Sequence, residues 1–171
     1  MKNEIANIDE EKFLQLLESN TGMIVKIAKA YTATFHERQD LVNDIIYQLW
    51  KSAKNFRGDS AVSTWIYRVS LNTSMNYGRK KKKDSRITYT GDPAPAASVS
   101  WLAAGDGEDP DETSLLYKCI DEMEGINKAI ILLYLDGNSH EQIAEVMGIT
   151  KTNVGTRMAR IKEFLRKKCN A

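Results

Sequence analysis

A helix–turn–helix pattern near the C-terminus constrains the fold of this chain more than any other feature. Ser139 precedes a short helical segment and Gln142 follows three residues later, which is the capping-box signature of a helix start. Gly148-Ile149-Thr150 predicts a tight turn that leads into a last helix over residues 151–168. The inner positions of both helices are small or apolar: Ile143, Ala144, Met147, Ile149, Val154 and Met158. Two short helices joined in this way are typical of DNA-binding domains.

The last helix exposes polar side chains suited to the major groove of DNA. Amide and guanidinium groups pair with base edges there, and hydroxyl groups donate or accept hydrogen bonds. The set comprises Lys151, Thr152, Asn153, Thr156, Arg157 and Arg160. Lys162 and residues 166–168 are also basic, and they are placed for phosphate contacts or for solvent.

A second polar and basic stretch covers residues 56–83. It opens with Phe56 and the turn Arg57-Gly58-Asp59-Ser60, where glycine permits a sharp bend and Asp59 or Ser60 can cap a helix. An apolar stripe, Val62, Ile66 and Val69, then predicts an amphipathic helix. A second stripe at the same spacing mixes an aromatic ring, amides and guanidinium groups: Trp65, Arg68, Asn72, Asn76 and Arg79.

Two readings of this second stripe remain open on its chemistry alone. The first is DNA binding: aromatic rings stack on bases and amides pair with base edges. The five consecutive basic residues from Arg79 to Lys83, Lys80 among them, would contact phosphates. A plain amphipathic helix with Trp65 at the edge of the core and a solvated basic tail explains the same residues.

The charge distribution divides the chain into two basic parts separated by an acidic one. Residues 1–83 carry 14 basic and 9 acidic groups, and residues 150–171 carry 7 and 1. Residues 84–112 carry 1 basic and 7 acidic groups, contain all three prolines, and include an isolated Trp101. We therefore expect an all-α chain of two small helical domains, residues 1–83 and 113–171, joined by an acidic flexible linker over 84–112.

Four helices are expected in the first domain, with the last of them inside residues 56–83. The others cover residues 10–19, 23–34 and 40–55, with a break at Asn20-Thr21-Gly22 and a polar break over 36–39. The third helix is apolar over an unusually wide arc, so part of it is free to meet a partner helix.

FRGDSAVSTWIYRVSLNTSMNY, residues 56–77, resembles the promoter-melting segment of bacterial sigma factors of the extracytoplasmic-function group. The segment from Asp136 to Lys168 resembles the C-terminal domain of the same group, which reads the upstream promoter element. The resemblance implies an alternative sigma factor with region 2 in the first domain and region 4 in the second. Its implied partners are core RNA polymerase, through the beta-prime clamp helices and the beta flap, promoter DNA and an anti-sigma factor.

The resemblance also implies a role for each candidate residue. The downstream (−10) element would meet Phe56, Arg57, Gly58, Asp59, Ser60, Trp65, Arg68, Asn72, Asn76, Arg79 and Lys80. The upstream (−35) element would meet Lys151, Thr152, Asn153, Thr156, Arg157 and Arg160. Polymerase would dock on Asp40, Asn43, Asp44, Ile46 and Trp50, where Asn43-Asp44 replaces the Gln-Glu pair usual in the family.

Other function classes lack their sequence signals. We find no nucleophile–base set, no phosphate-binding loop and no metal-ligand spacing, so no catalytic residue, cofactor or metal is expected. Cys119 and Cys169 are interpreted as buried or incidental thiols. With no signal peptide and no apolar run approaching about 20 residues, a cytoplasmic protein without membrane contact is expected. The alternative function is a stand-alone helix–turn–helix regulator whose first domain dimerises or senses a signal.

Overall fold

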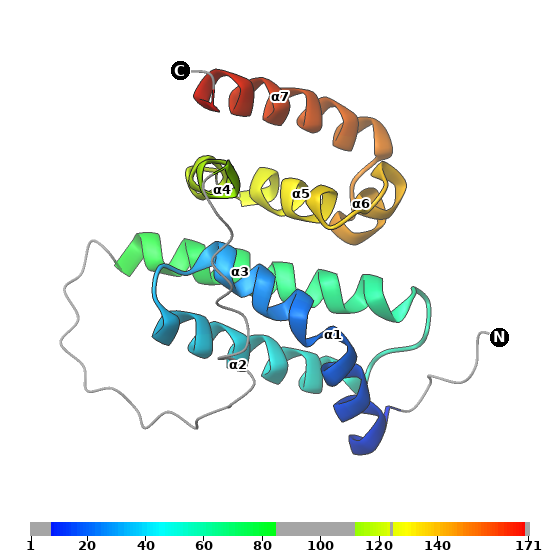
Figure 1. Cartoon of the computed structure of the whole chain (residues 1–171). Coiled ribbons are helices and arrows are strands. Elements are labelled where there is room, and N and C mark those ends of the chain that lie inside the picture. The colour runs from blue at the N-terminus through cyan, green and yellow to red at the C-terminus, as the bar shows by residue number, and fades with distance from the viewer. Residues whose placement is uncertain (1–7, 85–111, 124, 170–171) are drawn as a thin grey trace.

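The structure is a computed structural model that describes residues 8–84, 112–123 and 125–169. The described residues form seven helices, which group into two lobes (Figure 1). The first lobe contains α1 (Glu10–Tyr31), α2 (Phe35–Ala53) and α3 (Val62–Asp84). The second lobe contains α4 (Glu112–Asp121), α5 (Gly125–Leu135), α6 (His140–Met147) and α7 (Lys151–Cys169). The expected all-α fold of two helical domains is confirmed; the expected linker, with Trp101, falls almost entirely outside the described residues.

The first lobe contains three helices among its described residues, where the sequence predicted four. Residues 10–31 form one continuous helix because the polar side chains at the expected break bond back to it. Asn20 Nδ2 donates to the Leu16 carbonyl at 2.8 Å and Thr21 Oγ1 to the Leu17 carbonyl at 2.7 Å. These bonds satisfy the side chains without ending the helix, and Gly22 adopts helical backbone at a modest cost.

The polar stretch over 36–39 is also helical, which corrects the predicted break there. Thr34 caps α2, and a reciprocal capping box joins its side chain and backbone to Glu37. His36, expected in a loop, therefore lies in the first turn of α2, where its Nε2 is 3.6 Å from Asp40 Oδ2.

The helix–turn–helix prediction is confirmed by α6 and α7. Ser139 and Gln142 form the predicted capping box, and Gly148 ends α6 with a left-handed φ of 66°. Thr150 Oγ1 accepts from the Asn153 backbone N–H at 3.1 Å, which caps the start of α7. Ile143, Val154 and Met158 are buried between the two helices and their neighbours, as the inner pattern predicted.

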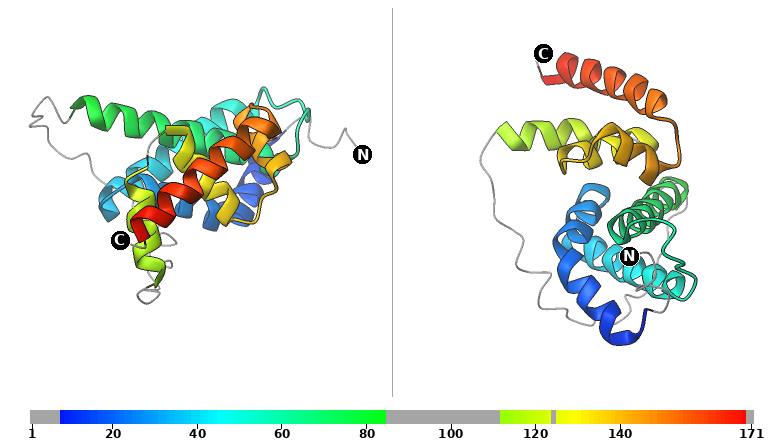
Figure 2. Two further views of the ribbon diagram at one scale, coloured as in Figure 1. Left: turned by 90° about the horizontal axis from the view of Figure 1, so that it is seen from above. Right: turned by 90° about the vertical axis from the view of Figure 1, so that its right-hand side faces the viewer.

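The buried apolar residues form two hydrophobic clusters. One lies within the first lobe, and the other contains residues of both lobes. The first cluster belongs to the first lobe and includes Leu41, Ile45 and Leu49 of α2. The second contains most of the buried residues of α4–α7 together with Ile27, Ala30 and Leu71 from α1 and α3. Two views at right angles place α4–α6 between the first lobe and α7 (Figures 1 and 2). The lobes therefore share a core.

Candidate nucleic-acid interface

The outer side of α7 presents most of the residues predicted to read the upstream element. α7 lies farthest from the first lobe, so solvent reaches its outer side freely (Figure 2). The exposed members are Lys151, Thr152, Asn153, Thr156 and Arg160. Lys151 Nζ forms an ion pair with Glu141 at the start of α6, and this contact lowers the pKa of the Glu141 carboxyl.

Arg157 is the one member of this set that is half-buried. Its Nε donates to Asn153 Oδ1 at 2.8 Å, and its Nη1 donates to Asn127 Oδ1 of α5 at 3.1 Å. The guanidinium therefore joins the recognition helix to the helix behind it. In this arrangement Arg157 orients α7 and Asn153, while Arg160 extends into solvent.

The predicted DNA stripe on α3 is only partly available. Asn72, Asn76, Arg79 and Lys80 are exposed at helical spacing. Arg79 Nη1 donates to Asn76 Oδ1 at 3.3 Å, which holds the two side chains together. Lys81, from the basic run, instead pairs with Glu37 at 2.7 Å, and that hydrogen bond is the main reason why the pKa of the Glu37 carboxyl is lowered.

Trp65 lies in the core of the first lobe, with only 8% of its surface exposed. Its ring contacts Phe56 with centroids 5.0 Å apart. The structure therefore places Trp65 at the core position that the alternative reading described. The preceding turn is open: Gly58 has a φ of 73°, and Arg57 and Asp59 extend into solvent.

Arg68 is directed at the second lobe. Its Nη2 donates to the Glu145 carbonyl at 2.7 Å and its Nε to the Val146 carbonyl at 3.3 Å. Both carbonyls belong to the last turn of α6, where helices have unpaired acceptors and a partial negative charge. Arg68 thus caps the first helix of the helix–turn–helix unit, a role that sequence patterning does not reveal.

Asp136, just after α5, receives two further contacts from the first lobe. Lys26 Nζ of α1 lies 3.0 Å from its Oδ1, and the Tyr67 hydroxyl of α3 donates to its Oδ2. Burial, followed by this hydrogen bond to a carboxylate, raises the pKa of Tyr67 to about 12. We call Lys26, Tyr67 and Asp136 the interlobe clasp.

A third stripe on α3 explains why the lobes meet, and sequence analysis missed it. Tyr67, Leu71 and Met75 recur every four residues, and all three pack in the cluster shared with the second lobe. Only the stripe of Val62, Ile66 and Val69 had been assigned to a core. The signal was present in the spacing, but it was hidden by the more polar stripe beside it.

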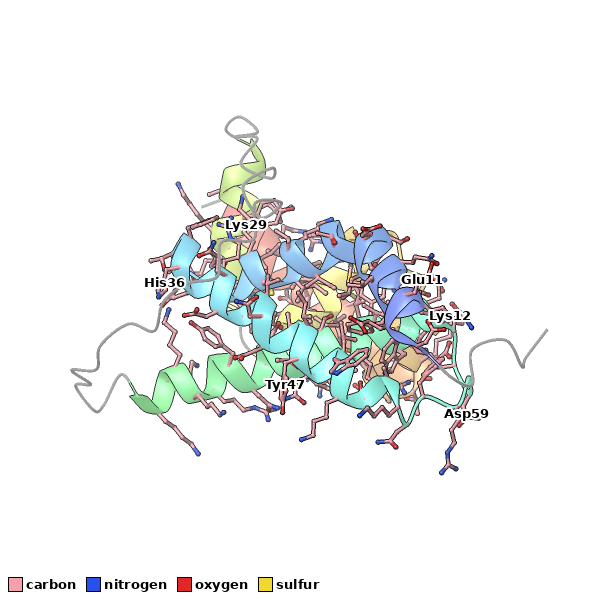
Figure 3. All side chains as sticks on the ribbon, turned by 90° about the horizontal axis from the view of Figure 1, so that it is seen from below. Glu11, Lys12, Lys29, His36, Tyr47 and Asp59 are labelled. Atoms are coloured by element: carbon pink, nitrogen blue, oxygen red, sulfur yellow. The ribbon has the colours of Figure 1, made fainter. Side chains whose placement is uncertain are left out.

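The outer side of α2 carries the predicted polymerase-binding residues. Asp40, Asn43, Asp44 and Trp50 are exposed and Ile46 is half-buried, so all five are accessible from one side. Tyr47 is 61% exposed among them and was not predicted, although its spacing from Asn43 and Asp44 would have placed it there. Figure 3 shows Tyr47 on α2 between the ends of the lobe marked by His36 and Asp59.

Within the described residues, none of the helices is both long and apolar enough to cross a membrane. The same residues contain no group of three or more His, Cys, Asp or Glu side chains arranged to hold a metal ion.

Comparison with known families gives two matches in the order of the two lobes. The family model Sigma-70 region 2 matches residues 16–84, and Sigma-70, region 4 matches residues 113–165. The chain is 28% identical to the ECF RNA polymerase sigma-E factor of Escherichia coli, over 92% of this chain and 86% of that protein. It is 29% identical to the RNA polymerase sigma-H factor of Pseudomonas aeruginosa, over 85% and 78%.

Solved structures share the fold. The sigma factor RpoE in complex with the anti-sigma factor NepR from Bartonella quintana superposes with a TM-score of 0.69 at 18% identity, over 94% of this chain and 98% of that one. CnrH in complex with the cytosolic domain of CnrY gives a TM-score of 0.64 at 17% identity, over 95% and 90%.

Proposed function

Because the chain belongs to the sigma-70 family and is an alternative sigma factor of the extracytoplasmic-function type, we propose that its two lobes contact promoter DNA and core RNA polymerase through separate helix faces. The observation that carries this proposal is the presence of an exposed polar face on one helix of each matched region, α3 and α7. We assign region 2 to residues 1–83, a connecting segment to 84–112 and region 4 to 113–171.

Polymerase docks on the outer side of α2. Trp50, whose ring packs edge-on against Phe13 at 4.9 Å, provides a fixed aromatic anchor, and Tyr47 provides an exposed one. Asp40, Asn43 and Asp44 surround these rings with acceptors for basic or amide groups. Aromatic anchors ringed by polar groups are typical of helix-docking surfaces with strong local binding energy. The partner is the clamp coiled coil of the beta-prime subunit.

The open turn after α2 and the exposed part of α3 bind the downstream element. Residues 56–60 accept an unstacked base of the non-template strand, at an unstacking cost of a few kcal/mol. Asn72 and Asn76 face neighbouring base edges, and Arg79 and Lys80 face the backbone. Trp65 contributes by supporting Phe56 from within the core.

The outer side of α7 reads the upstream element in the major groove. Asn153 and Arg160 offer amide and guanidinium donors, and Thr152 and Thr156 offer hydroxyl groups. Lys151 reaches phosphate once it leaves Glu141. Arg157 acts from behind by holding Asn153 in place.

The contacts between the lobes hold the free protein in a closed form, and the lobes separate when the protein binds polymerase. Arg68 cannot cap α6 and contact DNA with the same donors. Binding both lobes to one large partner supplies the free energy for their separation, since each docked lobe raises the effective concentration of the other site. An anti-sigma protein that binds this chain would compete for the same helix faces.

Run-off transcription with purified core polymerase tests the proposal. Polymerase is supplied with a library of promoter fragments, with and without this protein, and transcript starts are mapped. Discrete new starts that share two spaced sequence elements are expected. If polymerase neither binds the protein nor gains starts, while the protein alone selects palindromic duplex DNA, the protein is instead a stand-alone helix–turn–helix regulator.

A further inference from the structure

The two cysteines of the chain, 50 residues apart in sequence, lie against each other in the second lobe. Cys119 is buried on α4, and Cys169 is half-buried at the end of α7. Their sulfur atoms are 3.3 Å apart. A disulfide bond is about 2.05 Å long, so the sulfurs need to approach by only about 1 Å. Neither sulfur has been assigned a role in DNA or polymerase binding.

Contacts on both sides hold the two thiols together. Cys119 is followed by Ile120, which is fully buried in the shared core. On the α7 side, Lys168, which precedes Cys169, forms an ion pair with Glu122, just beyond the end of α4, with Nζ 2.6 Å from the carboxylate. The pair is therefore part of a packed junction between α4 and α7.

The two thiols differ in their accessibility to solvent. The Cys119 pKa is raised, first by its hydrogen bond to Cys169 and then by burial, so Cys119 stays protonated. Cys169 is the sulfur that solvent reaches. An oxidant from solution thus meets Cys169 first, with Cys119 behind it in position to react next.

We propose that Cys119 and Cys169 form a reversible intramolecular disulfide when the protein meets hydrogen peroxide. The Cys169 thiolate attacks one peroxide oxygen and becomes a sulfenic acid, and the other oxygen leaves as water after taking up a proton. The Cys119 sulfur then forms the S–S bond and displaces the sulfenic hydroxyl as a second water. Both sulfurs are oxidised by one electron each, and one peroxide is reduced to two waters. A dithiol reductant reverses the reaction.

The bond would tie the second lobe into a closed loop without covering its DNA face. Residues 151 and 169 are separated by about 27 Å along α7, at 1.5 Å per residue. The bond also couples the movement of α4 to that of α7. Without it, α4 could stay with the first lobe, because Met123, just beyond α4, packs in a cluster that includes Ile27 and Ala30 of α1. With the disulfide in place, α4 must leave α1 together with α7 when the lobes part.

Mass spectrometry of the full-length protein tests the proposal without any reference to transcription. After peroxide treatment the monomer is expected to lose the mass of two hydrogen atoms, and a non-reducing digest to yield one peptide pair joining Cys119 to Cys169. Closing a loop of this length is expected to raise the Tm of the oxidised protein by about 10 °C, and dithiothreitol should reverse both changes.

Cys169→Ser is the main control, because it leaves the buried Cys119 in place. This variant should show neither the mass loss nor the peroxide-dependent rise in Tm, and Cys119→Ser should behave likewise. Three outcomes would overturn the proposal: Cys169 oxidised to sulfinic acid with Cys119 still reduced, a disulfide-linked dimer, or a wild-type mass that peroxide leaves unchanged. Failure of the sigma-factor assignment would change none of these readings.

Discussion

The two helices proposed to contact DNA, α7 and α3, have similar amphipathic sequences but different surroundings. α7 packs on its neighbours along one side and leaves Thr152, Asn153 and Arg160 exposed. α3 packs along two sides, with Ile66 in the core of its own lobe and Leu71 in the core shared with the second lobe. As a result, the proposed DNA face of α7 is open to solvent, whereas one end of the α3 stripe contacts the second lobe.

The difference shows that a helix face with residues suited to DNA can also be a docking face within the same chain. Arg68 donates to α6 carbonyls with the groups that would meet phosphate, and Tyr67 beside it contacts Asp136. These polar contacts are exposed at their edges, so each contributes little net free energy, while the buried Leu71 contributes more. We therefore expect the closed form to rest mainly on the shared core and to be adjusted by the clasp.

The strongest test of the shared core is Leu71→Ala. Leu71 is 1% exposed, and removing its side chain should lower the free energy of unfolding by about 2–5 kcal/mol through lost burial and a residual cavity. Denaturant unfolding measures this, with Leu14→Ala, at a site 53% exposed, as the matched control. If the two variants unfold alike, the lobes do not share a core through α3.

Arg160→Ala tests the exposed outer side of α7. If Arg160 meets a base edge, the variant assembled with polymerase should bind its promoter about 1–3 kcal/mol more weakly, and lose discrimination at one position of the upstream element. Competition binding with matched and altered upstream elements gives both quantities. Lys167→Ala, whose ammonium pairs with Glu163, is the comparison, and its effect should be small and uniform over sequences. An equal, sequence-independent loss in both variants would reduce Arg160 to a phosphate contact.

Asp136→Asn tests the contact of α3 and α1 with the second lobe. The change removes the charge that Lys26 and Tyr67 share and should weaken the closed form by about 1 kcal/mol, a several-fold shift toward open molecules. The distance between fluorescent labels on the two lobes reports the shift, and polymerase should bind the variant more tightly by the same factor. Glu163→Gln removes an ion pair within α7 and should leave that distance unchanged. A closed population identical in both variants would show that the clasp does not hold the lobes.

The smallest expected effect is the pH dependence of the clasp. The pKa of Tyr67 is raised from 10.0 to about 12, so its neutral form is favoured in the folded protein. The stability that follows from this shift is complete below pH 10 and is lost as the pH rises toward 12. Tyr67→Phe should therefore show a flatter stability curve than the wild type over this range, measured by thermal unfolding. Parallel curves would mean that the Tyr67 hydroxyl titrates alike in both states.

Features that depend on neighbours three or four residues away could be predicted from the sequence. The capping box of Ser139 and Gln142, the left-handed Gly148 and the exposed set on α7 all follow from such local rules. The same local rules misled at residues 20–22, because a polar side chain that ends one helix can bond back to the carbonyls of another.

Contacts between distant residues could not be predicted in this way. Arg68 reaches carbonyls 77 and 78 residues away, Tyr67 reaches a carboxylate 69 residues away, and Cys119 meets a sulfur 50 residues away. None of these partners lies within a helical repeat of the residue it contacts. Periodicity identifies which faces of a helix are apolar or polar, but only the packing of the helices determines which face meets DNA, which meets solvent and which meets the other lobe.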